Sequence, residues 1–137
     1  FFTLYTLHSI LYPIFFRNFA PTMELLERKI IEGIQNKKGH RIVVVDMGGM
    51  QDTITKKFII CQGGSPSQVQ AIVESIGEEC RKVKAKPIAV DGLRNSVWVA
   101  MDYIDIIVHV FLPEEREYYD LEHLWADANV TEIPDLD

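Results

Sequence analysis

Residues 97–125 have the sequence VWVAMDYIDIIVHVFLPEEREYYDLEHLW. Two runs of β-branched and aromatic residues, 97–101 and 104–111, lie on either side of Asp102-Tyr103, and this pattern predicts a β-hairpin. Pro113 then favours the start of a helix, because proline suits the first helical position and the glutamates that follow it suit the positive end of the helix dipole. The stretch therefore predicts two paired strands followed by a short helix.

The chain before this stretch begins its regular structure at Met23. Leu26, Ile30 and Ile34 recur every four residues, which predicts an amphipathic helix. Gly39 follows at the position where a glycine commonly ends a helix. We therefore expect a first helix from Met23 that Gly39 stops.

Three further strands are expected, at 41–46, 58–61 and 86–90, because each is a short run rich in β-branched residues. Between the second and third, Ser65 is placed to cap a helix, with a proline after it and Gln68 at the capping-box position. The order is helix, two strands, helix, three strands and a short helix. It predicts the α/β class: a single domain with a mixed β-sheet of about five strands and helices packed on it.

The first 22 residues differ from the rest in composition. They contain no acidic residue and only one base, Arg17, and their apolar run is shorter than a membrane span requires. They also lack the positive start and small-residue cleavage site of a signal peptide. We expect residues 1–22 to be a non-native or upstream-translated extension, with Met23 as the natural start. A degenerate targeting segment is the alternative.

The carboxylates are concentrated at the end of the chain. The net charge is −6, and nine of the twenty acidic residues lie in 113–137 beside a single base, Arg116. Such a surface repels phosphate and attracts basic proteins, so we expect no direct DNA binding and a basic protein partner. For the last eight residues, a merely solvated tail is an equal alternative. Cys61 and Cys80 are expected to be reduced core residues of a cytoplasmic protein.

The sequence gives weak support to two kinds of chemical site. Gly63-Gly64-Ser65 precedes a helix and could cradle phosphate, as in a nucleotidyltransferase. Such an enzyme needs paired carboxylates, but Asp102 and Asp105 lie three residues apart, whereas residues facing one side of a strand lie two apart. His109, with His123 and Asp102, lacks metal-ligand spacing. We expect no catalytic residue, no metal and no cofactor.

The helix after Pro113 predicts a contact surface instead. Tyr118, Leu121 and Trp125 are related by i, i+3 and i+7, so one continuous helix would place them in a single stripe, flanked by Asp120 and Glu122. Such a stripe belongs either to the core or to an interface, and the pattern favours these two alternatives equally. Tyrosine and tryptophan are the residues that concentrate binding energy in interfaces.

Several segments together carry a family resemblance: Ile42-Val-Val-Val-Asp46, Phe58-Ile-Ile-Cys61, Gln68-Val-Gln-Ala-Ile72, Trp98-Val-Ala-Met-Asp-Tyr103, Val108-His-Val-Phe111 and Glu115-Arg-Glu-Tyr-Tyr-Asp-Leu-Glu-His-Leu-Trp125. They resemble the ribosomal silencing factor family, also called Iojap-like proteins, over about residues 24–128. On this basis we expect a silencing factor domain at 23–128 and an acidic C-terminal tail at 129–137.

The resemblance implies a nucleotidyltransferase-like fold without the catalytic carboxylates, and a binding protein rather than an enzyme. It implies that the protein binds the large ribosomal subunit through its fourteenth protein, blocks association with the small subunit and represses translation. A large-subunit assembly factor is the alternative, and an enzyme is a weaker one. An exposed hairpin edge or the aromatic stripe could also support a homodimer when the protein is free. We expect no membrane partner.

The family's motifs also imply a set of partner-binding residues. These are Trp98, Asp102, Tyr103, His109, Glu117, Tyr118, Tyr119, Asp120, Glu122, Leu124 and Trp125, whereas Phe111 and Leu121 are expected in the core. The chain departs from the family pattern at Lys56-Lys57, and it lacks an arginine just before Gln68. Because of these two departures, the resemblance does not predict whether residues near the start of the second helix contact the partner.

Overall fold

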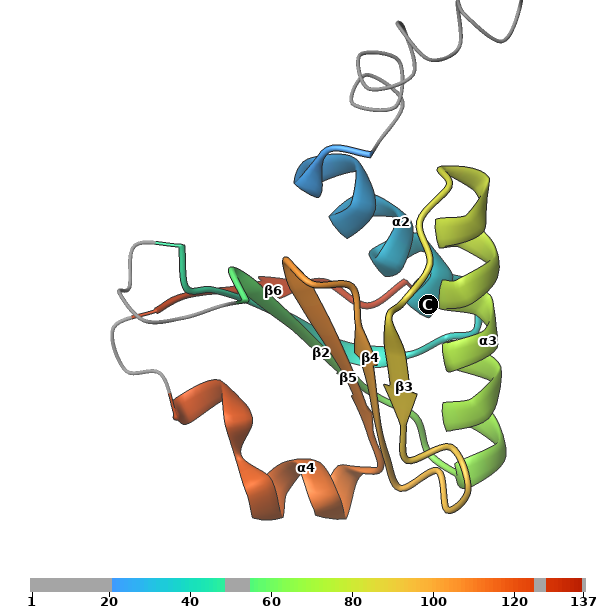
Figure 1. The fold of residues 1–137 in the computed structure, drawn as a ribbon. Helices are drawn as coiled ribbons and strands as arrows, with labels where there is room; N and C mark the ends of the chain where they lie inside the picture. Colours follow the sequence, from blue (N-terminus) through green and yellow to red (C-terminus); the bar gives the residue numbers. More distant parts are fainter. Residues whose placement is uncertain (1–20, 49–54, 125–127, 137) are drawn as a thin grey trace, which may run out of the picture.

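A computed structural model describes residues 21–48, 55–124 and 128–136 of the chain (Figure 1). The expected extension 1–22 therefore lies almost wholly outside the described residues. The elements follow in the order α2 (Met23–Asn36), β1 (His40–Asp46), β2 (Lys57–Gln62), α3 (Pro66–Lys82), β3 (Ala89–Asp91), β4 (Trp98–Asp102), β5 (Ile106–Phe111), α4 (Pro113–Tyr119), the 3₁₀ turn η1 (Leu121–His123) and β6 (Asn129–Ile133). The predicted α/β class is confirmed.

One mixed sheet organises the domain, with strand order β3-β4-β5-β2-β1-β6. All neighbours are antiparallel except β2 and β5, which run parallel and are joined by a long crossover through α3, β3 and β4. The predicted hairpin is confirmed: Trp98 pairs with Phe111, and Asp102 pairs with Ile107. Helices α2 and α3 lie on one face of the sheet, and α4 lies on the other (Figure 1).

The sixth strand, β6, lies within the segment expected to be an acidic tail. It pairs antiparallel with β1, with Val130 opposite Val45, and just beyond it the Asp135 carboxylate accepts a hydrogen bond from the Arg41 backbone N–H at 2.9 Å. Only Ile133 of the strand is even partly buried. An edge strand with so little burial has almost no hydrophobic alternation in its sequence. The sheet therefore has six strands, whereas about five were expected.

Helices α2 and α3 cross at a glycine. A Cβ added to Gly33 would lie 2.6 Å from the Cα of Ile76, so only a glycine allows the two backbones to approach this closely. Around the crossing, Ile30, Ile34 and Ile72 are fully buried beneath the sheet's first face. This packing confirms the predicted apolar stripe of α2.

Ser65 caps the start of α3 as the sequence predicts, whereas Gln68 bonds one residue before the N-cap and so does not form the expected capping box. Ser65 Oγ accepts a hydrogen bond from the Gln68 backbone N–H at 3.2 Å, and Gln68 Oε1 accepts one from the Gly64 N–H at 2.7 Å. The Gln68 amide also donates to the backbone carbonyls of Lys37 and Lys38. One side chain therefore joins the start of α3 to the end of α2.

The end of α2 differs from the prediction. The helix stops at Asn36, and Lys38, not Gly39, takes the left-handed conformation with φ 57°. The Gly39 N–H donates to the Ile34 carbonyl at 2.9 Å, and an added Cβ would lie 2.4 Å from the Ile34 side chain. Glycine is needed here for close packing rather than for a positive φ.

Within the three described ranges, no helix has both the length and the hydrophobicity that crossing a bilayer requires.

Candidate protein-docking surface

The second face of the sheet carries a small core of its own. Val43, Val45, Met47, Ile60 and Phe111 are buried there, and Phe58, Trp98, Leu121 and Ala128 pack against them while remaining partly exposed. Helix α4 and turn η1 lie over this face at the end of β5. The burial of Phe111 and the packing of Leu121 confirm that both are core residues.

A row of aromatic rings runs from this core to the solvent. Trp98 stacks on Phe111 with ring centroids 5.1 Å apart, and the Tyr119 ring lies 4.6 Å from the Trp98 ring. Tyr118 then stands perpendicular to Tyr119 at 5.1 Å. Tyr119 is 45% exposed and Tyr118 is 82% exposed. Aromatic side chains this exposed and this connected are characteristic of binding surfaces.

His109 anchors the inner end of the row. Its Nδ1 accepts a hydrogen bond from the Trp98 indole N–H at 3.0 Å, and the Phe58 ring stands perpendicular to it at 5.0 Å. Burial lowers the pKa of His109 to about 4, because removal from water disfavours the charged imidazolium. The ring is therefore a neutral acceptor at neutral pH.

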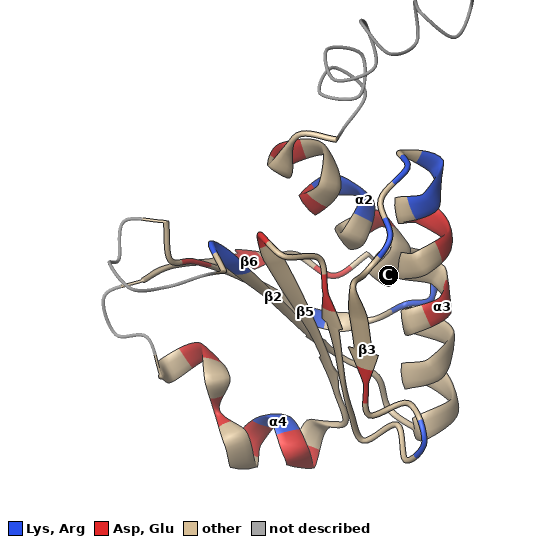
Figure 2. Cartoon of the chain, viewed as in Figure 1, with Lys and Arg blue, Asp and Glu red and all other residues tan. Residues whose placement is uncertain are grey.

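Exposed carboxylates border the aromatic row. Glu114, Glu117 and Asp120 are exposed, and Figure 2 shows acidic residues along α4 and the turn that follows it. Asp120 has φ 47° and ends α4 in the left-handed conformation, and its carboxylate contacts the exposed His123 ring at 2.5 Å. We call Trp98, Tyr118, Tyr119, Glu117 and Asp120 the docking surface.

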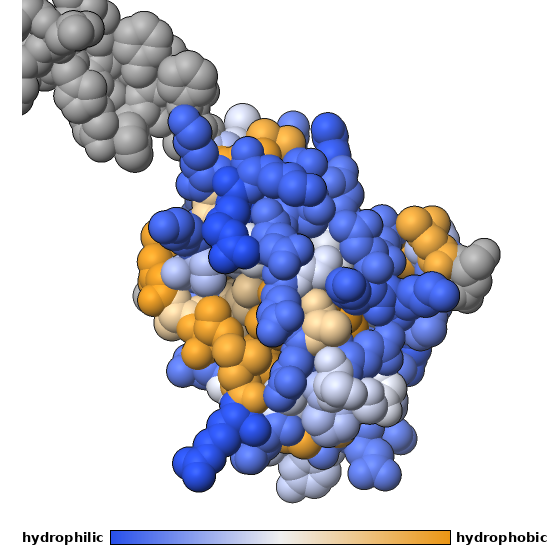
Figure 3. All heavy atoms as spheres, turned by 90° about the vertical axis from the view of Figure 1, so that its right-hand side faces the viewer, coloured by the Kyte–Doolittle hydropathy of each residue, from blue (hydrophilic) through white to orange (hydrophobic). Residues whose placement is uncertain are grey.

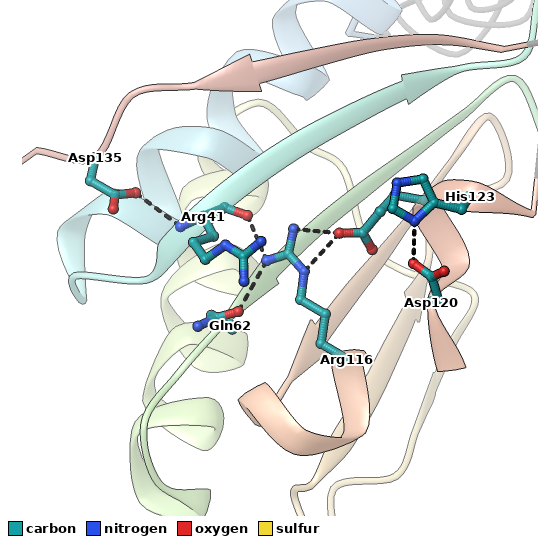
Figure 4. A network of polar contacts seen from close by, with 7 residues as sticks. Arg41, Gln62, Arg116, Asp120, His123 and Asp135 are labelled. Atoms are coloured by element: carbon teal, nitrogen blue, oxygen red, sulfur yellow. Dashed lines mark hydrogen bonds and ion pairs between the residues drawn. The ribbon is translucent and has the colours of Figure 1, made fainter. Parts of the chain in front are cut away.

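One buried cation, Arg116, holds α4 and η1 in place (Figure 4). Its side chain is 4% exposed and donates to the Arg41 carbonyl at 2.6 Å and more weakly to Gln62 Oε1 at 3.4 Å. Its Nε and Nη2 also lie 3.1 and 3.0 Å from Glu122 Oε1. The guanidinium therefore joins α4 to β1, β2 and η1.

The expected stripe of Tyr118, Leu121 and Trp125 on one continuous helix does not form, because α4 ends at Tyr119. The chain turns at Asp120, so Tyr118 and Leu121 do not share one helix face. Tyr118 is exposed, whereas Leu121 packs against the second core. Trp125 lies outside the described residues. The interruption comes from the left-handed Asp120, a conformation that aspartate tolerates better than most residues.

Other expected contact residues take different places. Tyr103 is 6% exposed and belongs to the core on the first face, so it does not contribute to the docking surface. Burial raises the pKa of Tyr103 and of Cys80, whose side chains contact one another. Glu122 is the partner of Arg116. Leu124 is 63% exposed and remains a candidate contact.

Asp102 lies on the same sheet face as Trp98, at the opposite end of β4. Its Oδ1 accepts a hydrogen bond from the Ile104 N–H at 2.8 Å within the hairpin turn. Trp98 and Asp102 are four residues apart, which is about 13 Å along a strand. A partner would have to cover much of this face to touch both.

The elements of a nucleotidyltransferase site are not assembled. Gly63-Gly64-Ser65 follows the last residue of β2, whereas Lys57, at the start of β2, hydrogen bonds to the Asp105 carbonyl. The glycine loop and Asp105 therefore lie at opposite ends of this strand, and the loop's Gly64 N–H is already bonded to Gln68. In the part of the chain that the structure describes, no group of three or more His, Cys, Asp or Glu side chains could hold a metal ion.

Sequence reasoning did not identify Arg116 or Gln62 as structural residues. A signal existed, because Arg116 is the single base among the acids of the chain's last segment. A lone arginine in such surroundings often has a carboxylate partner in the fold. Lys57, one of the two departures from the family pattern, forms an ion pair with Glu27 of α2 at 3.1 Å.

Comparison with known proteins identifies the family to which these features correspond. The family model described as "Ribosomal silencing factor during starvation" matches residues 21–137. The ribosomal silencing factor RsfS of Halalkalibacterium halodurans is 36% identical over 110 residues, which cover 80% of this chain and 92% of that protein. The RsfS of Bacillus subtilis is 36% identical over 98 residues, covering 72% of this chain and 82% of that protein.

A crystal structure of a Chromobacterium violaceum protein matches with a TM-score of 0.73 and 28% identity, over 77% of this chain and 88% of that one. A more distant relative is the mouse protein named "Mitochondrial assembly of ribosomal large subunit protein 1". It is 30% identical over 75 residues, which are 53% of this chain and 33% of that protein.

Proposed function

Because the chain belongs to the ribosomal silencing factor family, we propose that it binds the large ribosomal subunit at its joining face, through the subunit's fourteenth protein. Occupying that face excludes the small subunit and represses translation. The protein acts as a regulatory binding protein rather than an enzyme, and its docking surface makes the contact. We place this activity in the cytoplasm, although relatives named as chloroplastic and mitochondrial proteins exist.

The observation that supports the proposal best is the exposure of the aromatic row. Tyr118 and Tyr119 together present a large apolar area to solvent beside Trp98, and the described contact of the Tyr118 ring is with Tyr119. An exposed tyrosine with 82% accessibility contributes little to folding. Buried in a complex, it would be among the residues that concentrate binding energy.

The charge around the row indicates the chemistry of the partner. Glu114, Glu117 and Asp120 are exposed, whereas the one base of α4, Arg116, is buried and paired with Glu122. The surface is therefore acidic, and it complements a basic protein such as a ribosomal protein. Charges of this kind increase the association rate and select the partner more than they add affinity.

Co-sedimentation with purified large subunits tests the proposal. We expect Tyr118→Ala to weaken binding at least tenfold, since a central aromatic contact is worth about 1.4 kcal/mol or more. Ile88→Ala is the matched control, because Ile88 is an exposed hydrophobic residue (66%) that precedes β3 and lies outside the docking surface. Equal binding by both variants and the unaltered protein would exclude Tyr118 as a contact residue.

A large-subunit assembly factor is the second candidate function. The mouse relative's name, which includes assembly of the ribosomal large subunit, favours it. Both functions use the same docking surface, and they differ in the particle that is bound. Comparing affinity for mature subunits and for immature particles separates them.

The hairpin edge that was expected to support a homodimer is not exposed, because β4 pairs with β3 and β5 pairs with β2. We propose instead that the free protein pairs with a second copy through the side formed by α3 and β3. A groove of about 600 Å³ lies there, with Val73, Gly77, Val90 and Leu93 in its lining. Figure 3 shows hydrophobic side chains on this side surrounded by hydrophilic ones.

Acidic and basic side chains both line the groove. Glu74 and Glu78 lie along α3, and Arg81 and Lys86 lie near its end. A two-fold arrangement can match such a rim with itself, because each acid can face a base of the other copy. Sedimentation velocity of the free protein tests this, and a monomer at all accessible concentrations would exclude it.

A further inference from the structure

The orientation of Trp98 in the docking surface depends on a single directional contact. Its ring stacks on Phe111, and Tyr119 lies against it. Stacked rings have preferred arrangements, but these allow a wider range of distance and angle than a hydrogen bond does. The indole N–H is the ring's one hydrogen-bonding group, and it donates to His109 Nδ1 at 3.0 Å.

Strand register places the two side chains correctly for this bond. Trp98 pairs with Phe111 across β4 and β5, and His109 pairs with Ala100. Trp98 and His109 are therefore diagonal neighbours on one sheet face, a separation that aromatic side chains can span. The methyl group of Ala100 is small, so the indole can cross it to reach the imidazole.

Packing alone does not account for a histidine at this position. The indole is only a donor, so His109 Nδ1 must carry no proton and the proton must lie on Nε2. His109 is 7% exposed, and its Nε2 has no hydrogen-bond partner among the described residues. A buried N–H without a partner is destabilising, whereas a phenylalanine would fill the same space without that cost.

We propose that His109 is a positioning residue of the docking surface: its Nδ1 holds the Trp98 indole in the orientation that the partner protein contacts. His109 itself is too deeply buried to touch the partner. This inference rests on the proposed function, because it assigns the residue a part in docking rather than in folding.

Two variants of the full chain separate positioning from packing. His109→Phe keeps an aromatic ring but removes the acceptor, and we expect affinity for purified large subunits to fall about fivefold to tenfold, as for the loss of one hydrogen bond. His109→Asn restores an acceptor near the place of Nδ1, and we expect its affinity to stay within about twofold of the unaltered protein. Thermal unfolding confirms that both variants are folded.

Nuclear magnetic resonance of the indole N–H groups reports orientation directly. The chain has two tryptophans, and Trp98→Phe identifies the signal of Trp98. We expect that signal to move, and its protection from hydrogen exchange to fall, in His109→Phe but much less in His109→Asn. An unchanged signal in His109→Phe would overturn the proposal.

A double-mutant cycle gives the deciding result. If His109 acts through Trp98, then His109→Phe should have almost no further effect on binding when Trp98 is already Phe. An equal loss of affinity in both backgrounds, or full affinity of the single His109→Phe variant, would overturn the proposal. If the unaltered protein does not bind large subunits at all, the proposed function fails and this inference fails with it.

Discussion

Replacing Arg116 with leucine should destabilise the protein strongly, because Arg116 is a buried cation with several partners. The change removes the 2.6 Å hydrogen bond to the Arg41 carbonyl and both contacts with Glu122 Oε1. It also leaves Glu122, whose side chain is only 15% exposed, without its counter-charge. Breaking a buried pair in this way costs about 3–5 kcal/mol. Since Glu122 keeps some solvent contact, we expect a loss of about 3 kcal/mol in the free energy of unfolding.

Urea denaturation followed by circular dichroism measures this loss. With a slope of about 1.5 kcal/mol per molar urea for a small domain, the midpoint should fall by about 2 M. Arg94→Leu is the matched control, because Arg94 is exposed before β4 and should change stability by no more than about 0.5 kcal/mol.

The double variant Arg116→Leu with Glu122→Leu tests the cause of that loss. If the main cost is an uncompensated carboxylate, removing that carboxylate should recover at least half of the lost stability. An Arg116→Leu variant whose free energy of unfolding is within about 0.5 kcal/mol of the unaltered protein's, as for an ordinary surface substitution, would refute the reasoning. So would a double variant no more stable than the single one.

Three other predictions concern the exposed row, the helix crossing and pH. Tyr118→Ala should change the free energy of unfolding by less than about 0.5 kcal/mol in urea denaturation, because the side chain is 82% exposed; a larger loss would place it in the core. Gly33→Ala should cost about 1–3 kcal/mol, since its Cβ would meet Ile76 at 2.6 Å, whereas Gly77→Ala, with open space, should stabilise by about 0.5–1 kcal/mol. The pKa of His109 in the folded protein is lowered from its ordinary value of 6.5 to about 4. The contribution of His109 to the free energy of unfolding should therefore be complete above pH 6.5 and decrease as the pH falls towards 4. His109→Phe should lack this decrease.

The main features of the fold follow from hydrophobic pattern, and the exceptions have physical causes. The hairpin around Asp102 and the cap at Ser65 were predictable because strand alternation and capping are local signals. Strand β6 was not, because an exposed edge strand needs few apolar residues and draws its stability from backbone pairing with β1.

The docking surface was predictable only in part. Tyr118, Tyr119 and Trp98 were expected as contact residues, and the structure brings them together in one row. The break at Asp120 was not expected, because a left-handed residue changes the direction of the chain without altering the hydrophobic pattern. Nor could the partners of Arg116 be predicted, since Arg41 and Gln62 lie 75 and 54 residues away in the sequence.

Subunit joining in a sucrose gradient tests the central claim most directly. Purified large subunits are incubated with the protein, small subunits are added, and the fraction of joined ribosomes is measured. We expect fewer joined ribosomes with the unaltered protein, and recovery of joining with Tyr118→Ala at the same concentration. Binding of the unaltered protein to large subunits with no decrease in joining would contradict the silencing function.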